Sequence, residues 1–526
     1  MEKKKTNFLI GAFIIALSHI IVKLIGALYK IPLDRFVLTT IGMGIYSSSY
    51  TIYNWLFVIS TAGLPVAISK LVSEQIALGR EEEAKKIFKV SLRLLICVGL
   101  VAFLIMFFLA VPFAKLISAE SAYLTMMVMA PSLFFVAVSS SFRGYFQGRE
   151  NMVPTAVSEI IEALCKLIFG LLFAFIAMKL TGEYFIGSAG AIAGVTLGTV
   201  FSFIFLIIYY KTTRPKGSIK LSKGESNKIV TKLVALAIPV TLGVSVFTLT
   251  SLIDTAMIMN QLSGIGFPEQ ERLSMYGYLN RAITFFNLPP TIIASIALAI
   301  VPAISASNAI GAYEKSRETV ISALRITVLL AMPCAAGLSS LASPILGFVY
   351  QDSNYYHLLT IMGAATLFVT IVQVSNAILQ AYGKPWLPVY HMMAGGVVKI
   401  LVNLWLVSNP KINIYGAPVG TTLCYITVVV LNIISLKRVS GVKFGIVGFI
   451  IKPAIIGAVT FISAWFTYRY TMGVLGSTLS MIASIGVAAV CYLITLFKIK
   501  ALTDNEIILL PKGELILNKL KKFRLM

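Results

Sequence analysis

The stretch SHIIVKLIGALYK (residues 18–30) lies in the first long apolar run of the chain and decides how the whole sequence is interpreted. The run covers residues 8–28, close to the roughly 20 apolar residues with which an α-helix crosses a bilayer. Lys23 stands well inside it, where a charge costs about 3 kcal/mol unless it faces a bundle interior or a wet cavity. The stretch therefore predicts a membrane helix and a polar interior that Lys23 faces, although the amine could instead reach the outer membrane surface.

Apolar runs of this kind recur along the chain. Of its 526 residues 58% are hydrophobic and 12% charged, whereas a soluble domain is about 25% charged. The runs are too long, and alternate too little, for a transmembrane β-barrel. The sequence thus predicts an all-α polytopic membrane protein with about 14 transmembrane helices. The predicted spans are 8–28, 41–64, 88–111, 121–142, 155–178, 186–210, 229–261, 276–303, 319–341, 357–382, 387–408, 414–436, 446–468 and 473–497.

The net charge of +23 follows the predicted topology. With a cytoplasmic N-terminus, 31 of the 44 Lys and Arg residues fall in or at the edge of cytoplasmic segments and 8 fall in outward segments. This is the positive-inside pattern, and it places the C-terminus in the cytoplasm too. Nucleic-acid binding is not expected, because the charge is not gathered on a soluble module. The five scattered cysteines in apolar spans predict neither a metal site nor a disulfide framework.

Three short motifs occur twice in the same order, at offsets of 226 to 237 residues. LPVAIS (64–69) matches VPAIS (301–305), GRENMVP (148–154) matches GKPWLP (383–388), and GAIAGVTLG (190–198) matches GAPVGTTLC (416–424). Spans 1–6 and 7–12 are therefore predicted to be two parallel six-helix repeats, an arrangement typical of transporters. The predicted parts are an N-lobe (1–212), a cytoplasmic linker (213–228), a C-lobe (229–438), two extra spans (446–497) and a basic cytoplasmic tail (498–526).

Charged residues within the spans are the candidate functional residues. In span 1, His19, Lys23, Gly26 and Lys30 share one helical face. In span 5, Glu162 and Lys166 stand four residues apart, in the order that favours a structural ion pair, and Glu159 shares their face. If Lys166 is not held in that ion pair, we expect it to line the cavity. Lys399 is its counterpart in the second repeat and has no acid nearby in its own span.

Further polar candidates lie in spans 2, 7 and 8. Span 2 carries the polar-aromatic pair Tyr53 and Asn54, suited to helix packing or to sugar. Asp254 is the only charge of span 7, and Arg281 stands at the start of span 8. The two could pair with each other, or act as a cation site and an anion contact. The remaining cavity candidates, Asn280 and Asn287, form a polar stripe on span 8.

Away from the span ends, cations outnumber acids, so a cavity between these helices would be positive and would favour an anionic substrate. Lys and Arg both suit phosphate or pyrophosphate. The residues alone do not separate phosphate from carboxylate.

The segments GLPVAISKLVSE (63–74) and RGYFQGRENMVPTAVSEIIEALCK (143–166) resemble signatures of the MurJ/SpoVB-type flippases of polysaccharide precursors. These flippases belong to the multidrug/oligosaccharidyl-lipid/polysaccharide exporter superfamily. The resemblance extends to the tail motif LPKGE (510–514). It implies a bacterial cytoplasmic membrane protein whose two lobes enclose a V-shaped central cavity that opens alternately to each side. Spans 446–497 would then form a groove for a lipid tail.

The implied cargo is lipid II or a related undecaprenyl-pyrophosphate-linked sugar, carried outward by a monomer. The family's first span has an R-x-L-G pattern whose arginine faces the cavity, and the match here, Lys23 to Gly26, has Lys instead of Arg. Lysine keeps the charge and loses the bidentate fork. Lys30 and Arg281 correspond more loosely to two further family cations.

No catalytic residue, nucleotide motif or cofactor is expected. Na⁺, H⁺ or the membrane potential remains as the driving force, with Asp254 as the candidate coupling site. A multidrug antiporter of the same superfamily is the first alternative, disfavoured because the first span carries lysine and not an acid. Another lipid-linked oligosaccharide (teichoic, capsular or spore-related) is an alternative cargo. A glycosyltransferase would need a sizeable outward loop with a catalytic residue, and the outward loops are short.

Overall fold

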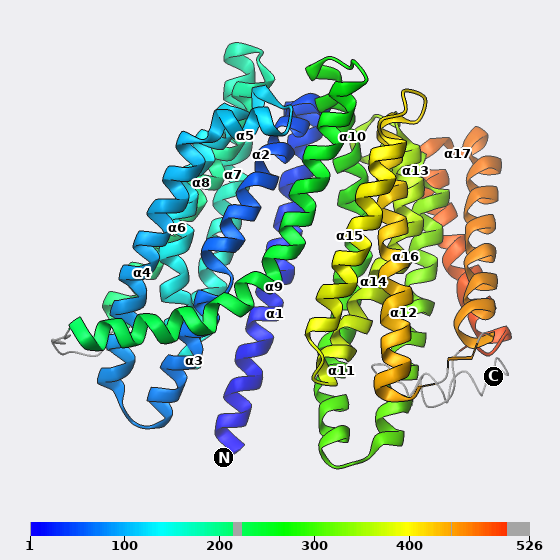
Figure 1. The fold of residues 1–526 in the computed structure, drawn as a ribbon. Helices are drawn as coiled ribbons and strands as arrows, with labels where there is room; N and C mark the ends of the chain where they lie inside the picture. Colours follow the sequence, from blue (N-terminus) through cyan, green and yellow to red (C-terminus); the bar gives the residue numbers. More distant parts are fainter. Residues whose placement is uncertain (1, 214–222, 443, 446, 502–526) are drawn as a thin grey trace. The chain divides into compact units, whose positions relative to one another are not determined.

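The computed structural model describes residues 2–213, 223–442, 444–445 and 447–501, and this part of the chain is helical without any strand (Figure 1). The predicted all-α fold is therefore confirmed. The tail predicted at 498–526 and the linker at 213–228 lie largely outside the described residues. The helices are α1 (Glu2–Pro32), α2 (Thr39–Thr61), α3 (Leu64–Ala77), α4 (Glu81–Phe108), α5 (Ala110–Leu116), α6 (Tyr123–Gly148), α7 (Val153–Thr181), α8 (Tyr184–Thr213), α9 (Lys223–Gly264), α10 (Glu269–Phe286), α11 (Leu288–Ala309), α12 (Tyr313–Ser340), α13 (Ala342–Tyr350), α14 (Tyr356–Ala381), α15 (Trp386–Leu406), α16 (Gly416–Ser440) and α17 (Lys452–Lys498). Short 3₁₀ or π turns cover Leu33–Leu38, Glu120–Ala122, Asn413–Tyr415 and Val447–Ile451.

Ten stretches among the described residues are long and apolar enough to cross a membrane. Two of them are composite: Leu17–Ala77 contains three helices, and Val447–Lys498 contains α17, which is interrupted at Gly476 (φ 74°). The count of fourteen spans remains a prediction.

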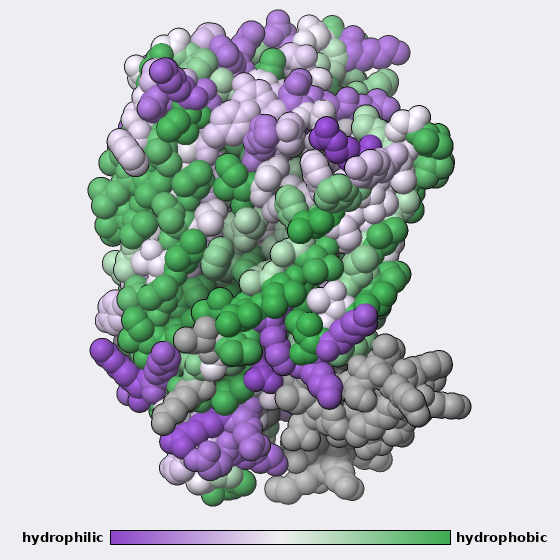
Figure 2. All heavy atoms as spheres, turned by 90° about the vertical axis from the view of Figure 1, so that its right-hand side faces the viewer, coloured by the Kyte–Doolittle hydropathy of each residue, from purple (hydrophilic) through white to green (hydrophobic). Residues whose placement is uncertain are grey.

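Large hydrophobic side chains such as Ile482 and Val490 are exposed on α17. On the face in Figure 2, hydrophobic residues cover the middle and hydrophilic residues gather at both ends, as a lipid-facing surface requires.

The chain forms two compact units, Met1–Gly277 (unit 1) and Tyr278–Met526 (unit 2). Helix α9, assigned to the C-lobe by the sequence, packs in unit 1 because glycines let backbones approach closely. A Cβ on Gly63 would lie 2.1 Å from the Ala237 carbonyl oxygen of α9. The first half of α10 docks on α2 in the same way, since a Cβ on Gly44 would lie 2.0 Å from the Leu273 carbonyl oxygen. The boundaries of the sequence repeat themselves remain a prediction.

The third pair of matching motifs forms equivalent helix contacts in the two units. In unit 1, α8 packs on α7 through Gly194, where a Cβ would lie 2.1 Å from the backbone nitrogen of Gly170. In unit 2, α16 packs on α15 through Gly420, where a Cβ would lie 2.1 Å from Oδ1 of Asn403. Small residues at such crossings are the usual way in which membrane helices approach each other closely. The repeated sequence thus corresponds to repeated packing.

We expect Gly194→Leu to destabilise the protein, because its side chain would have to displace the backbone of α7. Overpacking of this kind costs about 1–3 kcal/mol or more. The measurement is thermal unfolding in detergent. Gly473→Leu is the matched control, because nothing lies within 4 Å of the Cβ position at Gly473. Equal unfolding temperatures for the two variants would contradict the close packing of α7 and α8.

Candidate functional site

A polar cavity of about 390 Å³ lies within unit 1, among α1, α2, α6, α7 and α8. It brings together the charged residues that the sequence singled out in spans 1 and 5. Its lining consists of His19, Val22, Lys23, Gly26, Tyr29, Tyr50, Tyr53, Arg143, Glu159, Glu162, Ala163, Lys166 and Val195.

Helix α1 presents His19, Lys23 and Gly26 to this cavity from one face, as their spacing of four and three residues predicts. Lys23 is exposed along the cavity wall, so its side chain faces a polar space. His19 lies beside α7, with Nε2 3.4 Å from Oε2 of Glu159.

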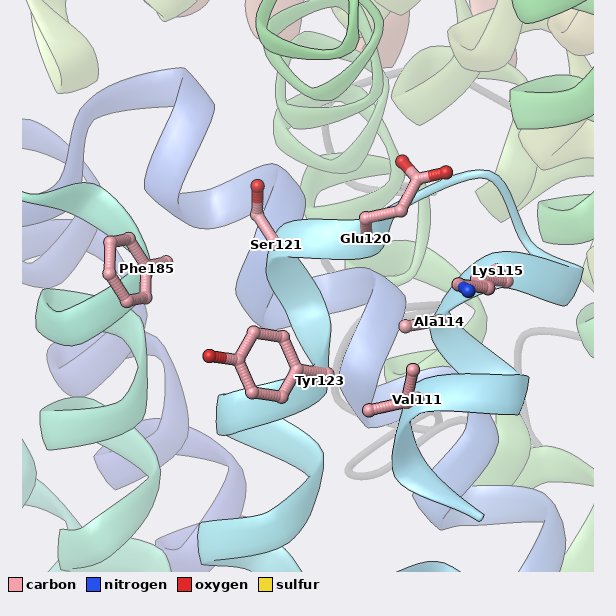
Figure 3. A pocket seen from close by; sticks show the side chains of 7 residues that line it. All are labelled: Val111, Ala114, Lys115, Glu120, Ser121, Tyr123 and Phe185. Carbon is pink, nitrogen blue, oxygen red and sulfur yellow. The ribbon is translucent and has the colours of Figure 1, made fainter.

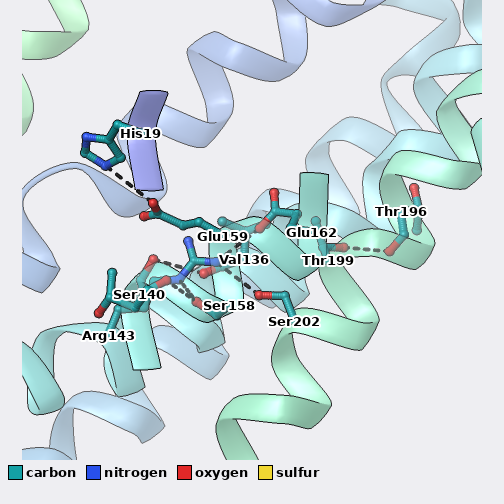
Figure 4. A network of polar contacts seen from close by, with 11 residues as sticks. His19, Val136, Ser140, Arg143, Ser158, Glu159, Glu162, Thr196, Thr199 and Ser202 are labelled. Atoms are coloured by element: carbon teal, nitrogen blue, oxygen red, sulfur yellow. Dashed lines mark hydrogen bonds and ion pairs between the residues drawn. The ribbon is translucent and has the colours of Figure 1, made fainter. Parts of the chain in front are cut away.

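Arg143 of α6 organises the opposite wall (Figure 4). Its Nη2 donates to Oε2 of Glu162 and to Oγ of Ser202, and its Nε donates to Oγ of Ser158, each at 3.1 Å. Its side chain is only 15% exposed, so these oxygens take the place of water around the guanidinium. The sequence left open whether Glu162 pairs with Lys166. In the structure the ion-pair partner of Glu162 is Arg143.

Lys166 instead lies against two tyrosine rings. Its Nζ is 4.9 Å from the ring centre of Tyr29 and 5.4 Å from that of Tyr50. Both are cation–π distances. On α2, Tyr50 also packs against Tyr53, with ring centres 5.5 Å apart. Tyr53 thus makes a ring contact within α2, and it also lines the cavity. Asn54 is half-buried on α2 outside this lining.

The named lining carries three basic side chains besides His19, those of Lys23, Arg143 and Lys166, and two carboxylates, those of Glu159 and Glu162. The cavity is therefore positive even when His19 is neutral. This agrees with the surplus of positive charge expected from the sequence. Lys30 lies further along α1, near Asp34 and Lys166, and is not part of this lining.

Arg281 of unit 2 lies beside an acid and two tyrosine rings. Its Nη1 donates to Oδ2 of Asp352 at 2.9 Å, and its guanidinium lies 4.7 Å from the ring centre of Tyr350 and 5.1 Å from that of Tyr278. The side chain is 4% exposed. Asp352 is thus an acidic partner of Arg281 within unit 2, and the pairing of Arg281 with Asp254 remains a prediction.

The other sequence candidates lie on three further stretches. Asp254 is half-buried on α9, Lys399 is half-buried on α15, and Asn280 is half-buried on α10, while Asn287 is exposed after the end of α10. Their roles in binding remain predictions.

A second cavity of unit 1, about 370 Å³ in volume, holds none of the predicted site residues (Figure 3). Tyr123 and Phe185 lie on one side, and Val111 and Lys115 of α5 on the other. Its lining is largely apolar, so it does not provide the same chemistry.

Sequence reasoning missed Arg143 and Asp352. Arg143 falls just after a predicted span and was counted as a cytoplasmic, topology-setting charge. Asp352 lies in the connection between α13 and α14. A usable signal for Arg143 was the row of serines before it, residues 139–141, which marks a polar helix.

These features define a multi-pass helical membrane protein with a positively charged cavity in its first unit. The family model described as "Polysaccharide biosynthesis protein" matches residues 8–308, more than half of the chain. The chain belongs to this family. The resemblance seen in the sequence is confirmed by two relatives from Bacillus subtilis (strain 168). The chain is 24% identical to "Lipid II flippase MurJ", over 93% of this chain and 94% of the relative, and 24% identical to "Stage V sporulation protein B", over 96% and 98%.

Among solved structures, the fold is similar to "Lipid II flippase MurJ, inward closed conformation", with a TM-score of 0.69 and 17% identity. The match covers 93% of this chain and 97% of that one. At this identity the likeness establishes the fold.

We expect Arg143 and Glu162 to stabilise the protein as a pair. Removing one partner of a buried pair typically costs about 3–5 kcal/mol, and about 1–3 kcal/mol is reasonable here because Glu162 is 30% exposed. Unfolding of Arg143→Gln, Glu162→Gln and the double variant in detergent measures the coupling. The double variant should lose less stability than the two single losses together. Strict additivity would contradict the pairing.

The pH dependence of stability should report on Asp352. Burial alone raises the pKa of this carboxyl, but hydrogen bonds from the Asn354 backbone N–H, the Tyr278 hydroxyl and Arg281 outweigh it, so its pKa lies below the ordinary 3.8. A lowered pKa adds stability above the unfolded-state value, and that stability is lost as the pH falls through the folded-state value. Between about pH 6 and pH 3, the unfolding temperature of the wild type should therefore fall further than that of Asp352→Asn. If the unfolding temperatures of the two proteins changed in parallel with pH, the lowered pKa of Asp352 would be contradicted.

Proposed function

We propose that the protein is a flippase that moves a lipid-linked saccharide precursor with an anionic head group across the membrane, with lipid II as the substrate. The observation that carries the proposal is the cavity of unit 1, where Lys23 and Lys166 face a tyrosine-lined space inside a membrane-spanning unit. Family membership and the relative named "Lipid II flippase MurJ" support it. Transport by alternating access follows from the repeated architecture.

In this proposal the two lysines contact the pyrophosphate. Lysine is a point charge on a flexible stem, and it neutralises a phosphate without the fixed geometry of a guanidinium. Arg143 acts differently, since three of its N–H donors bond to Glu162, Ser158 and Ser202 and hold the cavity wall. Tyr50 and Tyr53 offer aromatic faces to the sugar. Lys30, Arg281 and Lys399 are proposed as further cationic contacts.

The membrane potential is sufficient as a driving force. An inside-negative potential favours the outward movement of two negative charges by about 4–5 kcal/mol per 100 mV. If the cavity neutralises the head group, the potential acts on the return of the empty, positive carrier. No nucleotide is needed. Asp254 is proposed as a Na⁺ or H⁺ coupling site.

Two alternatives have specific support. The relative "Stage V sporulation protein B" is as similar in sequence as the flippase, which keeps a spore-related or another lipid-linked saccharide as a possible cargo. Glu159 and Glu162 are the acids that a cation-coupled multidrug antiporter would use. Each lies beside a basic or ionisable partner, His19 and Arg143, which disfavours a cationic substrate.

The test is reconstitution in vesicles with a fluorescent lipid II, with an imposed potential and an outside reagent that destroys accessible label. The wild type should change the fraction of protected label. Lys23→Ala and Lys166→Ala should each slow the movement about tenfold or more, because a charge-assisted contact is worth about 1.5–3 kcal/mol. Lys115→Ala, in the cavity of Figure 3, is the matched control and should behave as wild type.

Protection that is the same with and without the wild-type protein would overturn the lipid II assignment. Movement of another lipid-linked saccharide would then identify an alternative cargo. Wild-type rates in both lysine variants would remove the cavity of unit 1 from the pathway.

A further inference from the structure

A polar cavity of about 480 Å³ lies at one end of unit 2 and is not used by the proposed transport. It is formed where α11 ends, α12 begins and α14 and α16 end. Its lining is Asn308, Tyr313, Arg317, Tyr382, Arg438, Val439, Ser440 and Gly441.

The depth of this cavity matches that of lipid head groups. Three candidate membrane spans border it: one begins at Tyr313, one ends at Ala381 directly before Tyr382, and one ends at Ser440. The cavity therefore lies at the boundary between the apolar core of the membrane and water. Tyrosine is enriched at this boundary, because its ring is apolar and its hydroxyl can bond to water. The sequence predicts that this end faces the cytoplasm.

Arg317 forms part of the cavity wall and is held there by hydrogen bonds. Nε of Arg317 donates to the carbonyl oxygen of Ser440 at 2.8 Å, and Nη1 donates to Glu314, whose side chain is 81% exposed. The guanidinium lies close to the turn after α16: Gly441 has φ +69°, and a Cβ there would be 2.8 Å from Nη2. Tyr382 is fixed as well, because its hydroxyl lies 2.8 Å from Oγ of Ser316.

The second arginine faces the cavity differently. Arg438 is exposed in the last turn of α16, and none of the described acids forms an ion pair with it. At the predicted cytoplasmic end of unit 1, by contrast, Arg149 pairs with Glu81 at 3.1 Å, and Lys86 pairs with Glu83 and Glu225. The positive-inside rule accounts for basic residues at both ends. It does not account for a cavity between two arginines, two tyrosines and an amide.

We propose that this cavity binds a phosphate-bearing lipid head group. Basic pockets between membrane helices on the cytoplasmic side are suited to anionic head groups. Arg438 supplies a positive charge that faces the ligand. Arg317 forms part of the wall and stays positive toward the cavity, because its acidic partner Glu314 lies mostly in solvent. Neutral hydrogen-bonding groups come from Tyr313, Tyr382 and Asn308. A free phosphate compound offers the same oxygens, but a cavity at head-group depth favours a molecule anchored in the bilayer. The proposal does not depend on the transported substrate.

Native mass spectrometry of the full chain in detergent tests the proposal. The probes are phosphatidylglycerol, phosphatidylcholine with the same acyl chains, and inorganic phosphate. Phosphatidylglycerol should bind in preference to phosphatidylcholine, and Arg438→Gln should weaken its binding about fivefold, as expected for one basic residue near a head group. Arg149→Gln removes the same charge from the predicted cytoplasmic end of unit 1 and should leave this binding unchanged.

Equal binding of the two lipids, or equal losses in Arg438→Gln and Arg149→Gln, would overturn the site. Displacement of bound phosphatidylglycerol by inorganic phosphate at millimolar concentration would assign the cavity to a soluble anion and overturn the lipid assignment. Unchanged thermal unfolding of Arg438→Gln, whose side chain is exposed, shows that any loss of binding is not a loss of fold.

Discussion

A charge inside a membrane-spanning bundle persists only where other polar groups replace water around it. In this protein that condition is met at Arg143, whose guanidinium donates to a carboxylate and two serine hydroxyls from two other helices. The contact joins α6, α7 and α8 and holds Glu162 on one wall of the cavity. With that acid engaged, the lysines on α1 and α7 set the positive character of the space. The candidate site thus depends on a residue that does not itself offer free charge to a ligand.

A second constraint is the close contact between neighbouring helices at glycines. Gly194 on α8 and Gly420 on α16 stand at matching places of the sequence repeat, and each lets its helix lie directly against the preceding one. The same device joins α9 and the first half of α10 to α2 and α3, which puts them in unit 1. Glycine therefore accounts for the repeated packing and also for the departure of the unit boundary from the repeat boundary.

Local patterns in the sequence predicted much of this. The helical fold followed from apolar runs, and the shared face of His19, Lys23 and Gly26 followed from helical spacing, because both properties are carried by neighbouring residues. The ion pairs Glu162–Arg143 and Arg281–Asp352 could not be predicted, because Arg143 lies on α6 and Asp352 lies in a connection. For Glu162, nearness in sequence suggested Lys166 instead. Which unit α9 joins likewise depends on contacts with distant helices.

The helix packing depends on glycines, whereas the character of the cavity depends on other side chains, and this separation has an evolutionary consequence. At Gly170 and Gly194 the scaffold is held by main chain, which tolerates no added atom, whereas Lys23 is exposed along the cavity and takes no part in that contact. Exchanges at such lining positions can alter which cargo is accepted while the framework stays intact, since function resides in sites carried by a fold. One architecture can then diversify into carriers of different saccharides without first having to re-evolve its bundle.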